Sequence, residues 1–119
     1  MNQRIIFVVA PKNDQEMLAV LLASSYPLQF YRDLPCALRA AHKYAPQALF
    51  LAVSELHRRG LPALGRCKRR LPTTKIIVLT DNEADFLGQA ALGAGADAVL
   101  LKPLVKEALQ QAIAAPQFA

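Results

Sequence analysis

The chain has 119 residues, of which 54% are hydrophobic, and a net charge of +5. This length predicts one domain with an apolar core that needs neither disulfides nor metal ions. The apolar runs are too short for a membrane span or a signal peptide, so we expect a cytoplasmic protein without membrane contact. The positive charge is compatible with an acidic protein surface or with nucleic acid, and it does not choose between them.

The chain begins with the apolar run Arg4–Val9, which is typical of a strand buried on both faces. Asn13, followed by Glu16, predicts the capped start of a helix that ends near Tyr26. Leu28–Tyr31 is then expected to form a short second strand.

The middle of the chain repeats this alternation. A second helix is expected from Pro35 to Pro46, because proline suits the first turn of a helix and then stops one. Ala48–Val53 predicts a third strand, and a third helix is expected over residues 62–70. The two cysteines, Cys36 and Cys67, have neither metal-ligand nor redox spacing, so we expect reduced thiols and no metal site.

The last part of the chain contains the clearest strand, Lys75–Thr80. A fourth helix is expected over residues 83–92, ended by Gly93 and Gly95. Ala98–Leu101 predicts a fifth strand, and residues 105–114 predict a fifth helix.

Strands that alternate with helices predict a doubly wound α/β fold with a five-stranded parallel sheet covered on both faces. Functional residues then lie at the carboxyl ends of the strands. We expect one domain over residues 1–115 and a tail over 116–119, which is compatible with the start of a linker to an output domain.

Several residues at this edge carry a family resemblance. Thr80 ends the fourth strand, Ala94–Ala96 precedes the fifth strand, and Lys102-Pro103 follows it. In this order the pattern resembles the receiver domains of bacterial response regulators, which have a flavodoxin-like fold. The resemblance implies a cis peptide before Pro103 and a two-component signalling role.

The chain departs from the family where the chemistry occurs. The resemblance implies two acidic residues after the first strand, which hold magnesium, but Ala10 and Pro11 stand there. It implies a phosphoryl-accepting aspartate at the end of the third strand, where Ala52 stands, and an aromatic switch residue where Val99 stands. A methyl group neither attacks phosphorus nor ligates a hard cation. We therefore predict a pseudo-receiver that is not an enzyme and binds no magnesium or other cofactor.

Lys102 then needs another partner, such as Asp81, Asp14 or solvent. The resemblance places the partner or dimer surface on the face made by the fourth helix, fifth strand and fifth helix. The residues of this chain on that face are Phe86, Gln89, Ala90, Val99, Leu101, Lys106 and Gln110.

A basic cluster in and around the third helix supports a competing hypothesis of nucleic-acid or anionic-ligand binding. A solvated helix face would have the same composition. A further alternative is a receiver phosphorylated at an unusual residue, with Ser54 as a candidate acceptor. The members of the cluster are Arg58, Arg59, Arg66, Lys68, Arg69 and Arg70.

Overall fold

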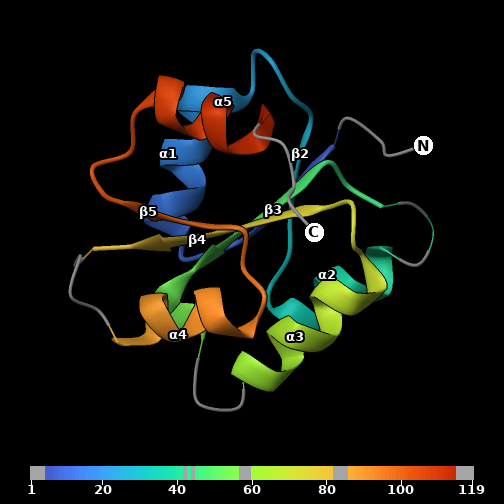
Figure 1. The fold of residues 1–119 in the computed structure, drawn as a ribbon. Helices are drawn as coiled ribbons and strands as arrows, with labels where there is room; N and C mark the ends of the chain where they lie inside the picture. Colours follow the sequence, from blue (N-terminus) through green and yellow to red (C-terminus); the bar gives the residue numbers. More distant parts are fainter. Residues whose placement is uncertain (1–4, 42, 44, 57–59, 82–85, 115–119) are drawn as a thin grey trace.

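The computed structural model describes residues 5–41, 43, 45–56, 60–81 and 86–114. Five parallel strands form one sheet in the order β2-β1-β3-β4-β5, as the doubly wound prediction requires (Figure 1). The strands are β1 Ile6–Val9, β2 Leu28–Phe30, β3 Ala48–Ala52, β4 Lys75–Thr80 and β5 Ala98–Leu101. The helices are α1 Lys12–Leu22, α2 Leu34–Ala41, α3 Gly60–Arg70, α4 Phe86–Ala94 and α5 Lys106–Ala114, with a 3₁₀ turn at Val53–Glu55.

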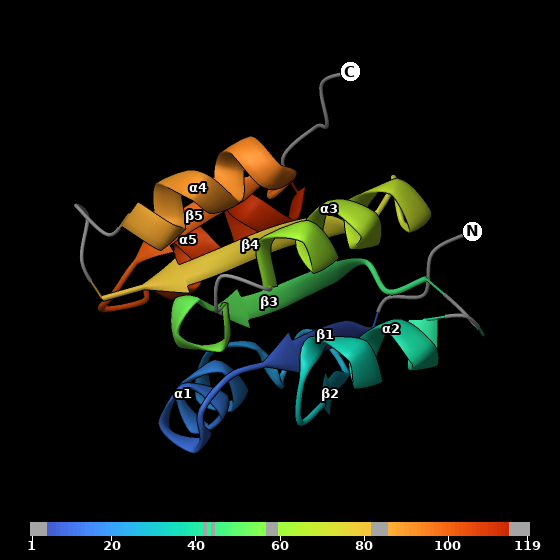
Figure 2. The same ribbon diagram turned by 90° about the horizontal axis from the view of Figure 1, so that it is seen from below.

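The helices form two layers around the sheet. Helices α1 and α5 cover one face, and α2, α3 and α4 cover the other (Figures 1 and 2). Alternate residues of each strand point into the two cores: Val8 packs beneath α1 and α5, and Phe7 packs beneath the other three helices. This explains why the central strands are apolar without alternation.

The start of α1 differs from the prediction. Asn13 lies inside the helix rather than at its cap, and Pro11 occupies the cap position with no side-chain hydrogen bond. The fixed φ of proline suits entry into a helix, so no capping side chain is needed at this end. The side chain of Gln15 instead donates a 2.9 Å hydrogen bond back to the carbonyl oxygen of Ala10.

The end of α4 also differs from the prediction. Gly93 lies within the helix, and Gly95 alone ends it, with φ +129°. This conformation is open to glycine and strained for other residues, and it allows the Gly95 amide to donate a 3.1 Å hydrogen bond to the Ala91 carbonyl oxygen.

Within the described residues, no helix has the length and apolar character needed to cross a membrane.

Candidate functional site

The carboxyl ends of β1, β3, β4 and β5 meet at one edge of the sheet, where the sequence predicts the functional residues. Ala10 and Ala52 are 6% and 1% exposed, and both methyl groups belong to the apolar core beneath α1 and α5. Pro11 is exposed. Thr80 is buried at the end of β4, and its carbonyl oxygen accepts a 2.9 Å hydrogen bond from the Lys102 amide.

Lys102 is the charged centre of this edge. Its Nζ donates to Oδ2 of Asp14 at 2.7 Å and lies 3.3 Å from Oδ1 of Asp81. The Asp14 side chain is 7% exposed and the Asp81 side chain is 81% exposed, so Asp14 provides the more strongly desolvated contact. Both were among the partners considered for Lys102 from the sequence, and the structure shows that the lysine contacts both.

The surroundings change the proton affinity of Lys102. Burial by itself lowers the pKa of Lys102, but the hydrogen bonds and charges of Asp14 and Asp81 outweigh it and raise the pKa above its ordinary value. The side chain therefore stays an ammonium ion over the whole physiological range. The peptide bond between Lys102 and Pro103 is cis, as the resemblance implied.

Part of the expected partner face surrounds a small pocket. A 240 Å³ pocket between α4 and β5 brings together Gln89, Val99 and Leu101 with Thr80 and Leu92. Phe86, one helical turn before Gln89, is 78% exposed.

Other residues of the expected partner face lie outside this pocket. Lys106 and Gln110 lie on α5, on the other side of the sheet, and do not line the pocket, while Ala90 is half-buried. Four exposed large apolar side chains of the described residues were missed from the sequence: Val20 at 83%, Phe30 at 42%, Leu92 at 43% and Val105 at 55% exposure. Leu92 can be recognised in the sequence as a large apolar residue of the fourth helix, two positions after Ala90. Only the packing of that helix shows that its side chain is exposed to solvent.

The structure separates the members of the basic cluster. Arg66, Arg69 and Arg70 are exposed on α3. Lys68 is half-buried, and its ammonium is bound by Asp97 at 2.8 Å. Lys68 is thus part of the fold rather than of a solvated patch. The remaining two members, Arg58 and Arg59, lie outside the described residues.

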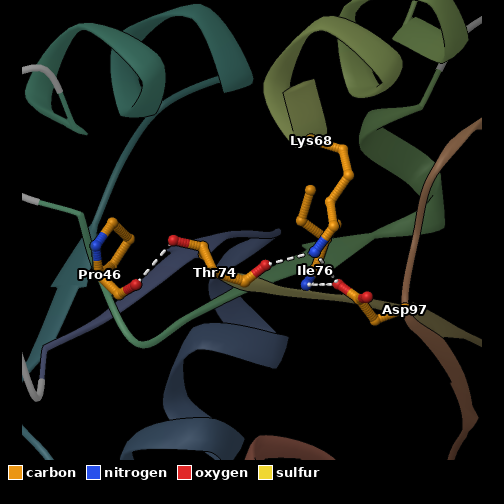
Figure 3. A network of polar contacts seen from close by, with 5 residues as sticks. All are labelled: Pro46, Lys68, Thr74, Ile76 and Asp97. Atoms are coloured by element: carbon orange, nitrogen blue, oxygen red, sulfur yellow. Dashed lines mark hydrogen bonds and ion pairs between the residues drawn. The ribbon is translucent and has the colours of Figure 1, made fainter. Parts of the chain in front are cut away.

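Lys68 belongs to a polar network at the opposite, amino-terminal edge of the sheet, which we call the amino-end clasp and define as Pro46, Lys68, Thr74, Ile76 and Asp97 (Figure 3). Oδ2 of Asp97 accepts hydrogen bonds from Lys68 Nζ and the Ile76 amide, both at 2.8 Å. Lys68 Nζ also donates a hydrogen bond to the Thr74 carbonyl oxygen at 2.9 Å. Thr74 Oγ1 in turn donates to the Pro46 carbonyl oxygen at 2.8 Å. The clasp joins α3 to the segments that enter β3, β4 and β5.

Comparison with known proteins gives a consistent family assignment. The family model described as "Response regulator receiver domain" matches residues 5–114. No curated protein sequence gives a significant match.

Solved structures agree with the fold. A response regulator from Thermotoga maritima superposes with a TM-score of 0.81 at 19% identity, covering 95% of this chain and 99% of that chain. A Burkholderia pseudomallei response regulator with a phosphorylated aspartic acid and a calcium ion gives 0.77 at 19% identity, covering 95% and 68%. Full-length FixJ from B. japonicum gives 0.76 at 22% identity, covering 95% of this chain and 57% of that chain.

Proposed function

The chain belongs to the response regulator receiver domain family, and on this premise we propose that it is a phosphorylation-independent pseudo-receiver. It acts in a two-component-like pathway by binding a protein partner or a second copy of itself, without enzymatic activity. The observation that carries the proposal is the pair of methyl groups of Ala10 and Ala52 at the strand ends where the family's chemistry requires carboxylates.

The residues at this edge do not fit a magnesium ion. Magnesium binds through carboxylate, phosphate and water oxygens, and Ala10, Pro11 and Ala52 offer no side-chain oxygen. Two carboxylates at this edge, those of Asp14 and Asp81, are both engaged by the Lys102 ammonium. A cation entering here would have to displace the lysine from both partners.

The same ion pairs support independence from phosphorylation. In a phosphorylated receiver a cationic side chain at this edge meets an arriving anion. Here Lys102 already has two anionic partners from its own chain. The charge of Lys102 is therefore compensated without an external phosphoryl group, and the conformation of this edge does not depend on one.

The partner surface is the apolar area around α4 and β5. Phe86, Leu92 and Leu101 expose 78%, 43% and 45% of their surfaces, and the 240 Å³ pocket lies between the last two. Exposed aromatic and aliphatic side chains beside a small pocket are typical anchors of a protein interface.

The first test is chemical. Incubation with acetyl phosphate and magnesium should leave the intact mass unchanged, whereas a receiver with all three carboxylates, treated alongside, should gain one phosphoryl group. Stoichiometric phosphorylation would overturn the proposal. Mapping it to Ser54 would favour a receiver that uses an unusual acceptor.

The second test locates the binding surface. Phe86→Asp and Leu101→Arg should abolish self-association in sedimentation velocity, or retention of the native partner, while far-UV circular dichroism confirms folding. The matched control is Val20→Asp, an equally apolar and 83% exposed position on α1. Loss of binding in the control but not in the two variants would contradict the assignment.

The exposed arginines of α3 favour one alternative function, the binding of nucleic acid or another polyanion. That activity would fall steeply with salt and would be lost in Arg66→Glu/Arg69→Glu/Arg70→Glu but not in Phe86→Asp. Lys68 is left unchanged in this variant because it holds the clasp.

A further inference from the structure

A groove lies between α2 and α3, at the amino-terminal edge of the sheet and away from Lys102. It has a volume of about 480 Å³ and is lined by Leu38, Ala41, Arg70 and Leu71. Ala41 ends α2 and Arg70 ends α3, so the groove lies beside the last turns of both helices. Among the described residues, the lining is apolar except for Arg70, and a space of this size takes one or two large apolar side chains.

The two helices beside the groove carry positive charge only. The segments Leu34–Ala41 and Gly60–Arg70 contain no aspartate or glutamate. Arg70 lines the groove itself, and Arg39 and Arg69 are exposed on the same two helices. No ion pair joins any of these three arginines to another described residue.

The groove is held in shape by the clasp. Lys68 lies two residues before Arg70, and its bonds to Asp97 and to the Thr74 carbonyl oxygen fix the last turn of α3. The Leu71 amide bonds Cys67 at 2.9 Å, and Thr74 bonds back to Leu71 at 3.1 Å. A preformed site binds with a smaller loss of conformational entropy than a mobile one.

We propose that this groove binds an acidic, amphipathic segment of a partner protein, with apolar side chains between α2 and α3 and a carboxylate on Arg70. Charge complementarity selects the partner's acidic side chains, and the apolar floor selects a peptide over nucleic acid. The surface is separate from the α4–β5 face and adds a second docking site at the other edge of the sheet.

The experiment uses a synthetic peptide of about four helical turns, with leucines along one face and glutamates along the other. Its affinity is measured by fluorescence anisotropy, and its site by amide shifts in NMR spectra. We expect saturable binding with the largest shifts at Leu38, Ala41 and Leu71. Arg70→Glu should weaken binding by about tenfold or more, and Arg70→Gln by less.

The matched control is Lys12→Glu, which makes the same change in net charge as Arg70→Glu but on α1, across the sheet. It should change the affinity by less than about twofold. A peptide with every leucine replaced by alanine keeps the charges but lacks the large apolar side chains. It separates the electrostatic contribution to affinity from the apolar one, and it should lose binding.

Three results would overturn the proposal. The alanine peptide could bind as well as the parent peptide, which would show that apolar contacts in the groove do not contribute to binding. Single-stranded DNA of equal charge could compete equally well, which would assign the arginines to a polyanion site. The control variant could lose as much affinity as the arginine variants, which would show that binding depends only on the overall charge of the protein.

Discussion

The two edges of the sheet are each organised around a lysine–aspartate pair, but the pairs have different neighbours. At the amino-terminal edge, Asp97 accepts a bond from the Ile76 amide, and Lys68 donates one to the Thr74 carbonyl oxygen. At the carboxyl-terminal edge, the Lys102 ammonium contacts the carboxylates of Asp14 and Asp81. The first pair therefore satisfies backbone groups of the sheet, whereas the second neutralises charge at its rim.

This difference explains how the fold persists with alanines at the ends of β1 and β3. At the carboxyl edge, Ala10 and Ala52 add methyl groups to an apolar core, and among the described residues no buried side-chain nitrogen or oxygen lacks a hydrogen-bond partner. A change at the amino-end clasp would break bonds that join four segments. The following predictions test this contrast, beginning with the largest effect.

Asp97→Ala should have the largest effect on stability, with a loss of about 3 kcal/mol in the free energy of unfolding. The substitution removes the acceptor of the buried Ile76 amide and the ionic partner of Lys68 together. Urea denaturation measures the loss. Asp97→Asn is the matched control: it keeps an acceptor for the amide and should lose about half as much. Equal losses in the two variants would show that the ion pair dominates.

Lys102→Met should be milder, with a loss of about 1 to 2 kcal/mol in the same measurement. Asp14 then loses its cation, but it lies in the first turn of α1, where the helix dipole favours a carboxylate. The double variant Lys102→Met/Asp14→Asn should recover part of the loss. A loss larger than that of Asp97→Ala would reverse the contrast between the edges.

Cys67 reports local opening beside the clasp. Burial raises the pKa of Cys67 to about 11, so this thiol should resist iodoacetamide at pH 8 while the half-buried Cys36 reacts. Asp97→Ala should speed the labelling of Cys67 by loosening the last turns of α3, and Lys102→Met should leave the rate unchanged. Mass spectrometry of the digested protein distinguishes the two cysteines. Equal acceleration by both variants would mean that they act through global unfolding.

The smallest effect concerns alkaline pH. Because the folded-state pKa of Lys102 is raised above 10.5, its stabilising contribution is complete below the unfolded-state pKa and is lost as pH rises through the folded one. Lys75 has the opposite sign: burial lowers its pKa, so its cost to the fold decreases as pH rises towards 10.5. The difference in stability between the wild type and Lys102→Met should thus be flat at neutral pH and shrink above 10.5. A difference that grows there would contradict the assignment.

Local sequence patterns predicted most of the fold. The strand Lys75–Thr80 was predicted with its observed bounds, as was Ala98–Leu101, because a short apolar run between turn residues has few other stable conformations. The helix starts were predicted less well. Asn13 matched a capping pattern, but Pro11 occupies the cap position of α1. Both residue types are compatible with the start of a helix, and the sequence alone does not show which of them is used.

By itself the sequence determined the alternation of strands and helices, the Lys102-Pro103 turn and the absence of carboxylates at Ala10 and Ala52, because each depends on residues close together in the chain. Only the tertiary structure decided which carboxylates meet which lysines. Lys102 and Asp14 are 88 positions apart, and Lys68 and Asp97 are 29 apart. Such pairs form only after the parallel strands align and the helices pack, since strand order and register fix which side chains share an edge.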